Sequence, residues 1–160
     1  MLNIGDKIND FCLNGIDEDS NEKVFCFKDL IKDKKDLILY FYPKDNTPGC
    51  TTEACDFRDN MNLLLKYANI SGISPDSVSS HKKFQEKHGL NFPLLSDPEK
   101  EVLKYFGAYG EKKMYGKLSM GVIRSTFLIS PEGKVKKIWR NVKAKGHVET
   151  IMKYLENQQF

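Results

Sequence analysis

The sequence has no long hydrophobic run, and no stretch approaches the ~20 apolar residues that a membrane helix needs. It also has no excess of one charge, because 25 basic and 22 acidic residues are scattered along the chain and give a net charge of +3. A scattered, nearly balanced charge argues against a nucleic-acid partner. The first residues, Met1 to Asp6, lack the basic and apolar regions of a signal peptide. We therefore expect a cytoplasmic protein with no membrane and no nucleic acid among its partners.

Cysteine is scarce as well. Four cysteines without a signal peptide are too few and too unevenly placed for the disulfide scaffold of a small secreted protein, so each must be argued separately. Internal repeats, low-complexity tracts and linkers rich in Pro, Gly or Ser are also absent from the sequence. With 160 residues, 40% of them hydrophobic, the chain can bury one good core but is too short for two ordinary domains. We expect a single domain over residues 1–160.

Hydrophobic periodicity predicts that strands and helices alternate. Residues 10–13 and 23–27 flank a turn-rich segment and are expected to form an N-terminal hairpin. The apolar run 37–42 stops at Pro43, as a buried central strand would. From Cys50 onward, apolar residues recur at steps of three and four, which is the core stripe of a helix: Ala54, Phe57, Met61, Leu64 and Ala68.

The rest of the chain continues this alternation. Further strands are expected at residues 70–73, 122–129 and 135–139, and further helices at 75–89, 96–107 and 148–155. The order of elements suggests a central mixed β-sheet with helices on both faces and an N-terminal β-hairpin. This α/β layout is compatible with a thioredoxin-like fold.

Cys50 lies between the most clearly predicted strand and the most clearly predicted helix, where an α/β sheet presents residues at its carboxyl edge. Thr47 can cap the helix and Pro48 can be its first residue, which leaves Cys50 in the first turn. The positive end of a helix favours a thiolate over a thiol. The core stripe extended backwards reaches Cys50, so its sulfur should point inward.

Cys55 is expected on the polar face of the same helix, with Arg58, Asp59, Asn62 and Lys66 as its neighbours at helical spacing. Five residues of ideal helix separate two Cα atoms by roughly 8.5 Å. A disulfide needs less than about 7 Å. If Cys50 and Cys55 ever join, the first turns of the helix must therefore unwind.

Spacing alone leaves other interpretations open. A cysteine on a core stripe is commonly an inert small hydrophobe, and two cysteines five residues apart form a weak pattern. A structural zinc site is less expected, because His81, His88 and His147 stand singly, without the spacing of ligands. We interpret these histidines as surface groups or as satisfied core groups.

Arg124 falls within the expected strand 122–129, on a face with apolar and small residues. A guanidinium there is costly unless an anion meets it. A cysteine thiolate, or the oxygens of a peroxide, would be such an anion. The alternative is that Arg124 lies at a strand edge and reaches solvent.

The pattern Pro43-x-x-x-Thr47-x-x-Cys50 resembles the active-site motif of the peroxiredoxins. The longer string Tyr-Phe-Tyr-Pro-Lys-Asp-Asn-Thr-Pro-Gly-Cys-Thr-Thr-Glu-Ala-Cys-Asp-Phe-Arg-Asp is similar to the bacterioferritin comigratory protein, or peroxiredoxin Q, subfamily almost letter for letter. The resemblance continues through Ser-Pro-Asp-Ser-Val, Phe-Pro-Leu-Leu-Ser-Asp-Pro and Arg-Ser-Thr-Phe-Leu-Ile, so it covers nearly the whole chain.

This resemblance implies a thioredoxin fold and a peroxidase that uses no metal, haem, flavin or other cofactor. It implies Cys50 as the peroxidatic cysteine, Cys55 as the resolving cysteine, and Pro43, Thr47 and Arg124 as the remaining site residues. It also implies that hydrogen peroxide and organic hydroperoxides are the substrates, that thioredoxin is the reductant, and that the protein is a monomer. The alternative function is dithiol-disulfide exchange without peroxide chemistry, although such proteins usually carry Cys-x-x-Cys.

Cys12 and Cys26 depart from the subfamily pattern, which has Thr or an aliphatic residue at these positions. Both lie in the expected N-terminal hairpin, where they could face each other. We interpret them as buried apolar thiols in preference to a second redox pair.

Overall fold

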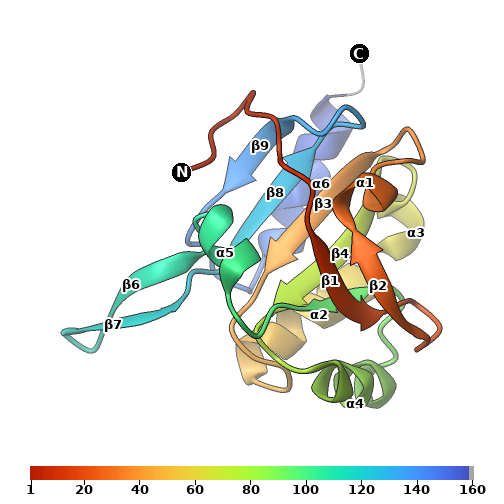
Figure 1. Ribbon diagram of the computed structural model, residues 1–160. Coiled ribbons are helices and arrows are strands. Elements are labelled where there is room, and N and C mark those ends of the chain that lie inside the picture. Colours follow the sequence, from red (N-terminus) through yellow and green to blue (C-terminus); the bar gives the residue numbers. More distant parts are fainter. Residues whose placement is uncertain (159–160) are drawn as a thin grey trace.

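The structure is a computed structural model that describes residues 1–158. The described residues form a mixed sheet of seven strands in the order β2-β1-β5-β4-β3-β8-β9, with a separate β6–β7 hairpin that extends away from it (Figure 1). The strands are β1 (Cys12–Ile16), β2 (Glu22–Cys26), β3 (Asp36–Phe41), β4 (Ala68–Ser74), β5 (Leu94–Ser96), β6 (Tyr109–Met114), β7 (Lys117–Val122), β8 (Ser125–Ile129) and β9 (Val135–Trp139). The helices are α1 (Phe27–Leu30), α2 (Pro48–Asp59), α3 (Met61–Leu64), α4 (Val78–His88), α5 (Glu101–Tyr105) and α6 (His147–Asn157).

The sheet is mixed because β3, β4 and β5 run parallel, whereas β1, β2, β8 and β9 add antiparallel pairs at its two sides. Alternate residues of a strand point to opposite faces. Ile38 and Tyr40 of β3 accordingly join a buried cluster with residues of α2, α4 and α6, whereas Leu39 and Phe41 join a second cluster with α1 and α5. The predicted mixed sheet with helices on both faces is therefore confirmed, and so is the N-terminal hairpin. Within residues 1–158, no helix is both long enough and apolar enough to span a membrane.

Several parts of the predicted layout were wrong. β5 was missed, because its three residues are too few to show a period; they pair with β4 and β1, and the following helix begins at Glu101 rather than near residue 96. The β6–β7 hairpin was missed; β6 carries the charged run Glu111 to Lys113, and the apolar Leu118 and Met120 that alternate along β7 are exposed and not part of the core. The long helix after Cys50 breaks at Asn60 into α2 and α3, and Ala68 belongs to β4.

The expected strand 122–129 is also interrupted. Val122 ends β7, and β8 begins only at Ser125. Between them, the Ile123 N–H donates to the Ala108 carbonyl at 2.7 Å, and the Arg124 carbonyl accepts from the Val142 N–H at 3.0 Å. These backbone groups bond to other segments, so Arg124 lies in a connection whose direction strand alternation does not fix.

The N-terminal hairpin holds Cys12 and Cys26 directly opposite each other, and their sulfurs are joined in a disulfide. Cys12 is exposed and Cys26 is half-buried. The interpretation of these residues as buried apolar thiols was therefore wrong.

Packing beneath α2 depends on a close approach between β3 and β4. Tyr40 of β3 is paired with Gly72 of β4, and a Cβ atom at residue 72 would lie 2.8 Å from the Tyr40 ring. The ring is 1% exposed and stacks on Phe57 of α2 with 4.5 Å between the ring centroids. Glycine at residue 72 thus leaves room for the Tyr40 ring that supports α2, the helix that contains Cys50.

We predict that Gly72→Ala destabilises the protein by about 1–3 kcal/mol, because the added methyl group must displace an enclosed aromatic ring. Gly110→Ala in β6 is the matched control, since a Cβ there meets only Ile123 at an ordinary 3.6 Å. Urea unfolding of both variants measures the difference. Equal stabilities for the two variants would contradict the packing account.

Candidate active site

Cys50 lies in the first turn of α2, directly after the loop that follows β3. Thr47 is the N-cap and Pro48 the first helical residue, as predicted, and Cys50 is 2% exposed. The first N–H groups of a helix have no partners within it, and the helix dipole favours negative charge at this end. The sulfur is therefore enclosed beside the positive end of the α2 dipole.

Arg124 reaches this sulfur from the connection between β7 and β8. Its Nη2 lies 3.3 Å from the Cys50 Sγ, and its Nη1 donates to Glu53 Oε1 at 2.6 Å. The Arg124 side chain is only 15% exposed. Burial alone would lower the pKa of Arg124, but the charges of Glu53 and Cys50 raise it above its ordinary value. The guanidinium is thus a fixed cation between a sulfur and a carboxylate, and it does not reach out to solvent as the alternative interpretation required.

Glu53 is a site residue that sequence reasoning missed. It is fully buried one turn after Cys50, and its Oε2 has no hydrogen-bond partner among the described residues. Burial raises the pKa of Glu53 from 4.5 to about 7, although Arg124 opposes this shift. The 2.6 Å ion pair favours the carboxylate and burial favours the acid. The balance places the titration of Glu53 close to neutral pH.

Thr47 occupies the N-cap position but does not cap the helix with its side chain. Its Oγ1 donates to the Lys44 carbonyl at 2.8 Å, across a loop in which Asn46 has a left-handed φ of 61°. Because the hydroxyl hydrogen is already donated, the Thr47 oxygen is left as an acceptor toward a ligand. Pro43, half-buried, begins the same loop.

Asp45 anchors this loop through a buried network that the sequence analysis did not single out. Its carboxylate accepts from the Tyr42 hydroxyl at 2.6 Å and from Ser80 Oγ at 2.8 Å, and it lies 2.7 Å from His81 Nδ1. His81 Nε2 lies 2.9 Å from the Leu95 carbonyl, so this nitrogen carries a hydrogen. His81 is a satisfied core group, in agreement with our interpretation of the histidines.

The oxygen and nitrogen atoms of Asp45, Asp76 and His81 lie within 4.8 Å of one another, as they would around a metal ion. They are engaged with protein groups instead: the Asp45 N–H and the Ser74 hydroxyl both donate to Asp76 Oδ2, at 2.8 and 2.7 Å. We therefore describe the cluster as the hydrogen-bonded anchor of the Cys50 loop.

His147, at the start of α6, is a second buried histidine close to the site. Its Nε2 lies 2.7 Å from Thr126 Oγ1. Burial, together with the charge of Arg124, lowers the pKa of His147 to about 4. His147 is therefore neutral near pH 7 and adds no positive charge beside Cys50.

Cys55 lies in the same unbroken helix as Cys50, half-buried. Both cysteines are free thiols. The position of Cys55 away from the core agrees with its predicted place on the polar face. Sequence reasoning therefore located both cysteines of α2 correctly.

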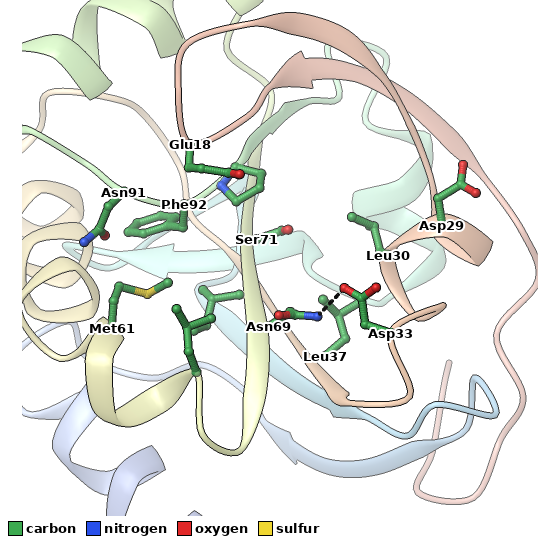
Figure 2. Close-up of a pocket in the computed structure, with 13 residues that line it drawn as sticks. Glu18, Asp29, Leu30, Asp33, Leu37, Met61, Asn69, Ser71, Asn91 and Phe92 are labelled. Carbon is green, nitrogen blue, oxygen red and sulfur yellow. Dashed lines mark hydrogen bonds between the residues drawn. The ribbon is translucent and has the colours of Figure 1, made fainter.

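A hollow in the described structure lies elsewhere. It has a volume of about 350 Å³, and Figure 2 shows its lining, which includes Leu37, Asn69 and Phe92. These residues stand at or just before the amino ends of β3, β4 and β5, whereas Cys50 follows the carboxyl end of β3. The hollow is therefore remote from the sulfur and is not part of its site.

The chain is similar in sequence to a known family and to curated proteins. Residues 4–138 match the AhpC/TSA family. Peroxiredoxin Bcp of Bacillus subtilis is 46% identical over 157 residues, which are 98% of this chain and 96% of that protein. A putative peroxiredoxin bcp of Helicobacter pylori is 43% identical over 155 residues, 96% of this chain and 98% of that protein.

Solved structures agree. A mutant of Xylella fastidiosa PrxQ superposes with a TM-score of 0.87 at 38% identity and covers 100% of this chain and 99% of its own. Bacterioferritin comigratory protein of Xanthomonas campestris, a structure concerned with alkyl peroxide reduction activity, gives 0.78 at 40% identity over 91% of each chain. The predicted thioredoxin-like fold is confirmed. The chain belongs to the AhpC/TSA family and is a peroxiredoxin of the bacterioferritin comigratory protein, or peroxiredoxin Q, type.

Proposed function

We propose that the peroxidase chemistry of this chain takes place at Cys50, with Arg124, Thr47 and Pro43 around it and Cys55 as its resolving partner. The observation that carries the proposal is the 3.3 Å approach of Arg124 Nη2 to the buried Cys50 Sγ at the start of α2. A protein that only exchanges disulfides needs no buried guanidinium beside a single sulfur. The peroxidase is therefore preferred to that alternative.

In the first step, the Cys50 thiolate attacks the terminal oxygen of the peroxide, which carries the hydrogen. The S–O bond forms, the O–O bond breaks, and the leaving oxygen takes a proton to become water or an alcohol. Negative charge spreads from sulfur over both oxygens as this happens, so donors already oriented there bind the transition state better than the bound peroxide. Arg124 and the free N–H groups of the first turn of α2 are such donors, Thr47 accepts the peroxide hydrogen, and Pro43 limits access of water.

In the second step, the Cys55 sulfur attacks the Cys50 sulfenic acid, a disulfide forms and water leaves. Both cysteines lie in α2, and an ideal helix keeps their Cα atoms roughly 8.5 Å apart. The first turns of α2 therefore have to unwind before the bond can form. Slow unwinding would leave the sulfenic acid exposed to further oxidation.

A protein dithiol then returns two electrons to the Cys50–Cys55 disulfide, and we propose thioredoxin for this role. Hydrogen peroxide and organic hydroperoxides are the proposed substrates; the Xanthomonas campestris relative is described for alkyl peroxide reduction.

We further propose that residues 1–160 act as one domain, in support of which one sheet joins both ends of the described chain. We also propose that the protein works as a monomer in the cytoplasm.

Cys50→Ser should abolish peroxide turnover and leave the fold intact, because serine is nearly isosteric but is a far weaker nucleophile. Thioredoxin-coupled consumption of NADPH, with hydrogen peroxide and an organic hydroperoxide compared side by side, measures this. The matched control, Cys12→Ser with Cys26→Ser, keeps its activity. Turnover at the wild-type rate in Cys50→Ser would overturn the assignment.

Arg124→Lys should slow the second-order reaction with peroxide by roughly 10- to 100-fold, because a flexible ammonium cannot contact Cys50 and Glu53 at once. Stopped-flow oxidation of the reduced protein gives this rate directly. Arg140→Lys is a control with a guanidinium that instead bonds backbone carbonyls, including those of Phe106 and Leu2. An unchanged rate in Arg124→Lys would assign this residue a structural role.

Glu53→Gln should change how stability depends on pH. Glu53 has a folded pKa of about 7, raised from 4.5, so it favours the folded state below about pH 4.5 and this contribution is lost as the pH rises to 7. Between these limits the stability of the wild type relative to Glu53→Gln should fall by roughly 3 kcal/mol. Urea unfolding from pH 5 to pH 8 measures most of this change.

The exposed Glu99→Gln is the control for this experiment. Its stability difference from the wild type should stay constant over the same range. If the Glu53→Gln difference is equally constant, Glu53 does not titrate near neutral pH and the account of its burial fails.

Cys55→Ser should still react once with peroxide, because Cys50 and its surroundings are unchanged. The variant should then stop as the sulfenic acid, fail to turn over with thioredoxin and become overoxidised more easily. In the wild type, oxidation should speed amide hydrogen exchange from Cys50 to about Asp59, where α2 unwinds. Normal turnover of Cys55→Ser, or unchanged exchange in α2, would contradict the proposed resolving step.

A further inference from the structure

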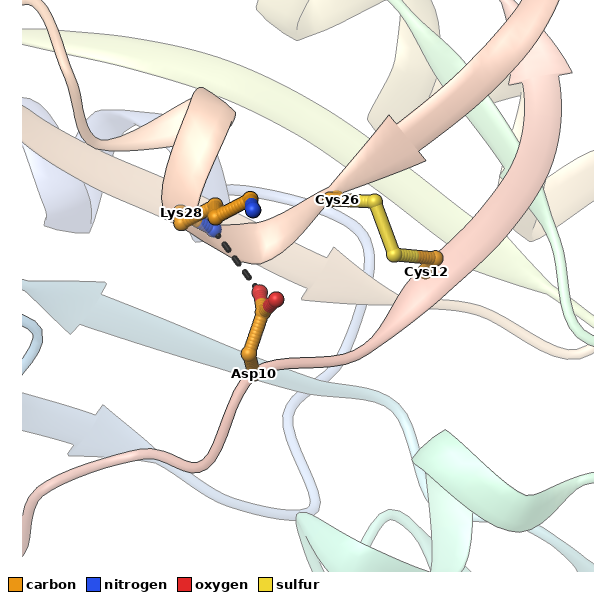
Figure 3. The surroundings of a disulfide bond; sticks show 4 residues. All are labelled: Asp10, Cys12, Cys26 and Lys28. Atoms are coloured by element: carbon orange, nitrogen blue, oxygen red, sulfur yellow. Dashed lines mark hydrogen bonds between the residues drawn. A yellow bond between two sulfur atoms is a disulfide. The ribbon is translucent and has the colours of Figure 1, made fainter.

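The N-terminal hairpin carries a second pair of cysteines that the proposed peroxidase cycle does not use. Cys12 and Cys26 are register partners in β1 and β2, 4.0 Å apart at their Cα atoms, and Figure 3 shows the disulfide that joins them. Cys50 and Cys55 are meanwhile free thiols. The chain therefore holds one pair oxidised and one pair reduced.

The disulfide lies where another protein can reach it. Cys12 is exposed and Cys26 half-buried. β2 is one of the two edge strands of the seven-stranded sheet formed by the described residues. The next residues on the same face of the hairpin, Asn14 and Val24, are also exposed. Because attack on a disulfide depends on access to a sulfur, this bond is open to an incoming thiolate at Cys12.

The disulfide is also separate from the Cys50 site. β5 and β4 lie between β1 and β3 in the sheet, so at the usual spacing of about 4.8 Å the strand of Cys12 is about 14 Å from the strand that leads to Cys50. The guanidinium that contacts Cys50 contacts Glu53 on its other side. Arg124 therefore serves Cys50 and not the hairpin pair.

A role limited to holding the hairpin together explains the position of the bond poorly. β1 and β2 already pair over five residues, and β1 pairs with β5 on its other side. Phe25, Phe27 and Leu13 pack this region into the core independently of the sulfurs. Exposed disulfides are also among those most readily reduced, whereas structural disulfides resist reduction.

We propose that Cys12–Cys26 is a second redox site, which exchanges two electrons with a protein dithiol of the thioredoxin class independently of Cys50. The inference rests on the proposed function only for the class of partner. It adds a thiol–disulfide exchange activity at the edge of the sheet. The ratio of disulfide to dithiol at Cys12 and Cys26 then follows the ratio of oxidised to reduced partner.

A partner thiolate attacks the exposed Cys12 Sγ, the bond between Cys12 and Cys26 breaks, and Cys26 leaves as a thiolate that takes up a proton. The second thiol of the partner loses its proton and attacks the partner sulfur of the mixed disulfide, which releases Cys12. The partner ends as a disulfide and the hairpin as two thiols; an oxidised partner drives the reverse reaction.

The test uses the full chain with Cys50→Ser and Cys55→Ser, so that Cys12–Cys26 is the only disulfide the chain can offer. Without any peroxide, thioredoxin, thioredoxin reductase and NADPH should consume one NADPH per chain, and two thiols per chain should appear. The same chain with Cys12→Ser and Cys26→Ser added should consume none. This readout does not depend on peroxidase activity. The second redox site can therefore be disproved without disproving the proposed function, and the reverse also holds.

A second measurement uses the wild-type chain with native thiols. Alkylation and peptide mass mapping should find two labelled cysteines before treatment with reduced thioredoxin and four afterwards, with the new labels on Cys12 and Cys26. If the hairpin disulfide survives thioredoxin in both proteins and opens only on denaturation, it is a structural link and the proposal is wrong.

Discussion

The active site depends on one buried guanidinium. Arg124 lies between the Cys50 sulfur and the Glu53 carboxylate, with contacts of 3.3 and 2.6 Å, in a place where an unpaired cation would be costly. The charges of Glu53 and Cys50 offset the burial of Arg124 and raise its pKa above the ordinary value. The buried Glu53 carboxylate accepts from Nη1 of the guanidinium, which leaves Nη2 beside the sulfur.

The rest of the fold brings these three groups together from distant segments. β3 leads into the loop that α2 continues, and the Asp45–His81 network ties this loop to α4 and β5. Arg124 comes from the break between β7 and β8, where backbone bonds to Ala108 and Val142 hold the chain out of the sheet. Tyr40, packed over Gly72, supports α2 from below. Cys50 lies in the first turn of α2 and Cys55 in the second, so the proposed oxidation of Cys50 and the unwinding of α2 are linked through one helix.

Much of this arrangement could be predicted from the sequence, because local patterns specify it. The three- and four-residue steps from Cys50 to Leu64 gave the inward direction of the sulfur, and the Thr47-Pro48 pair gave the start of the helix. Other features depend on contacts that no local pattern carries. β5 is too short to show a period, and Arg124 was assigned to a continuous strand that tertiary hydrogen bonds interrupt. Glu53 is polar, and its burial is explained only by its bond to Arg124, which lies 71 residues further along the sequence. The Cys12–Cys26 bond follows from hairpin register, which the sequence suggested only as a possibility.

The central claim is that Cys50 is the sulfur that peroxide oxidises and that its oxidation ends in a bond to Cys55. The most direct test treats the reduced wild-type protein with one equivalent of hydrogen peroxide, blocks the remaining thiols and maps the disulfides by mass spectrometry. We expect a new Cys50–Cys55 disulfide. A new bond from Cys50 to Cys12 or Cys26, or a Cys50 that is still a free thiol while the peroxide has been consumed, would contradict it.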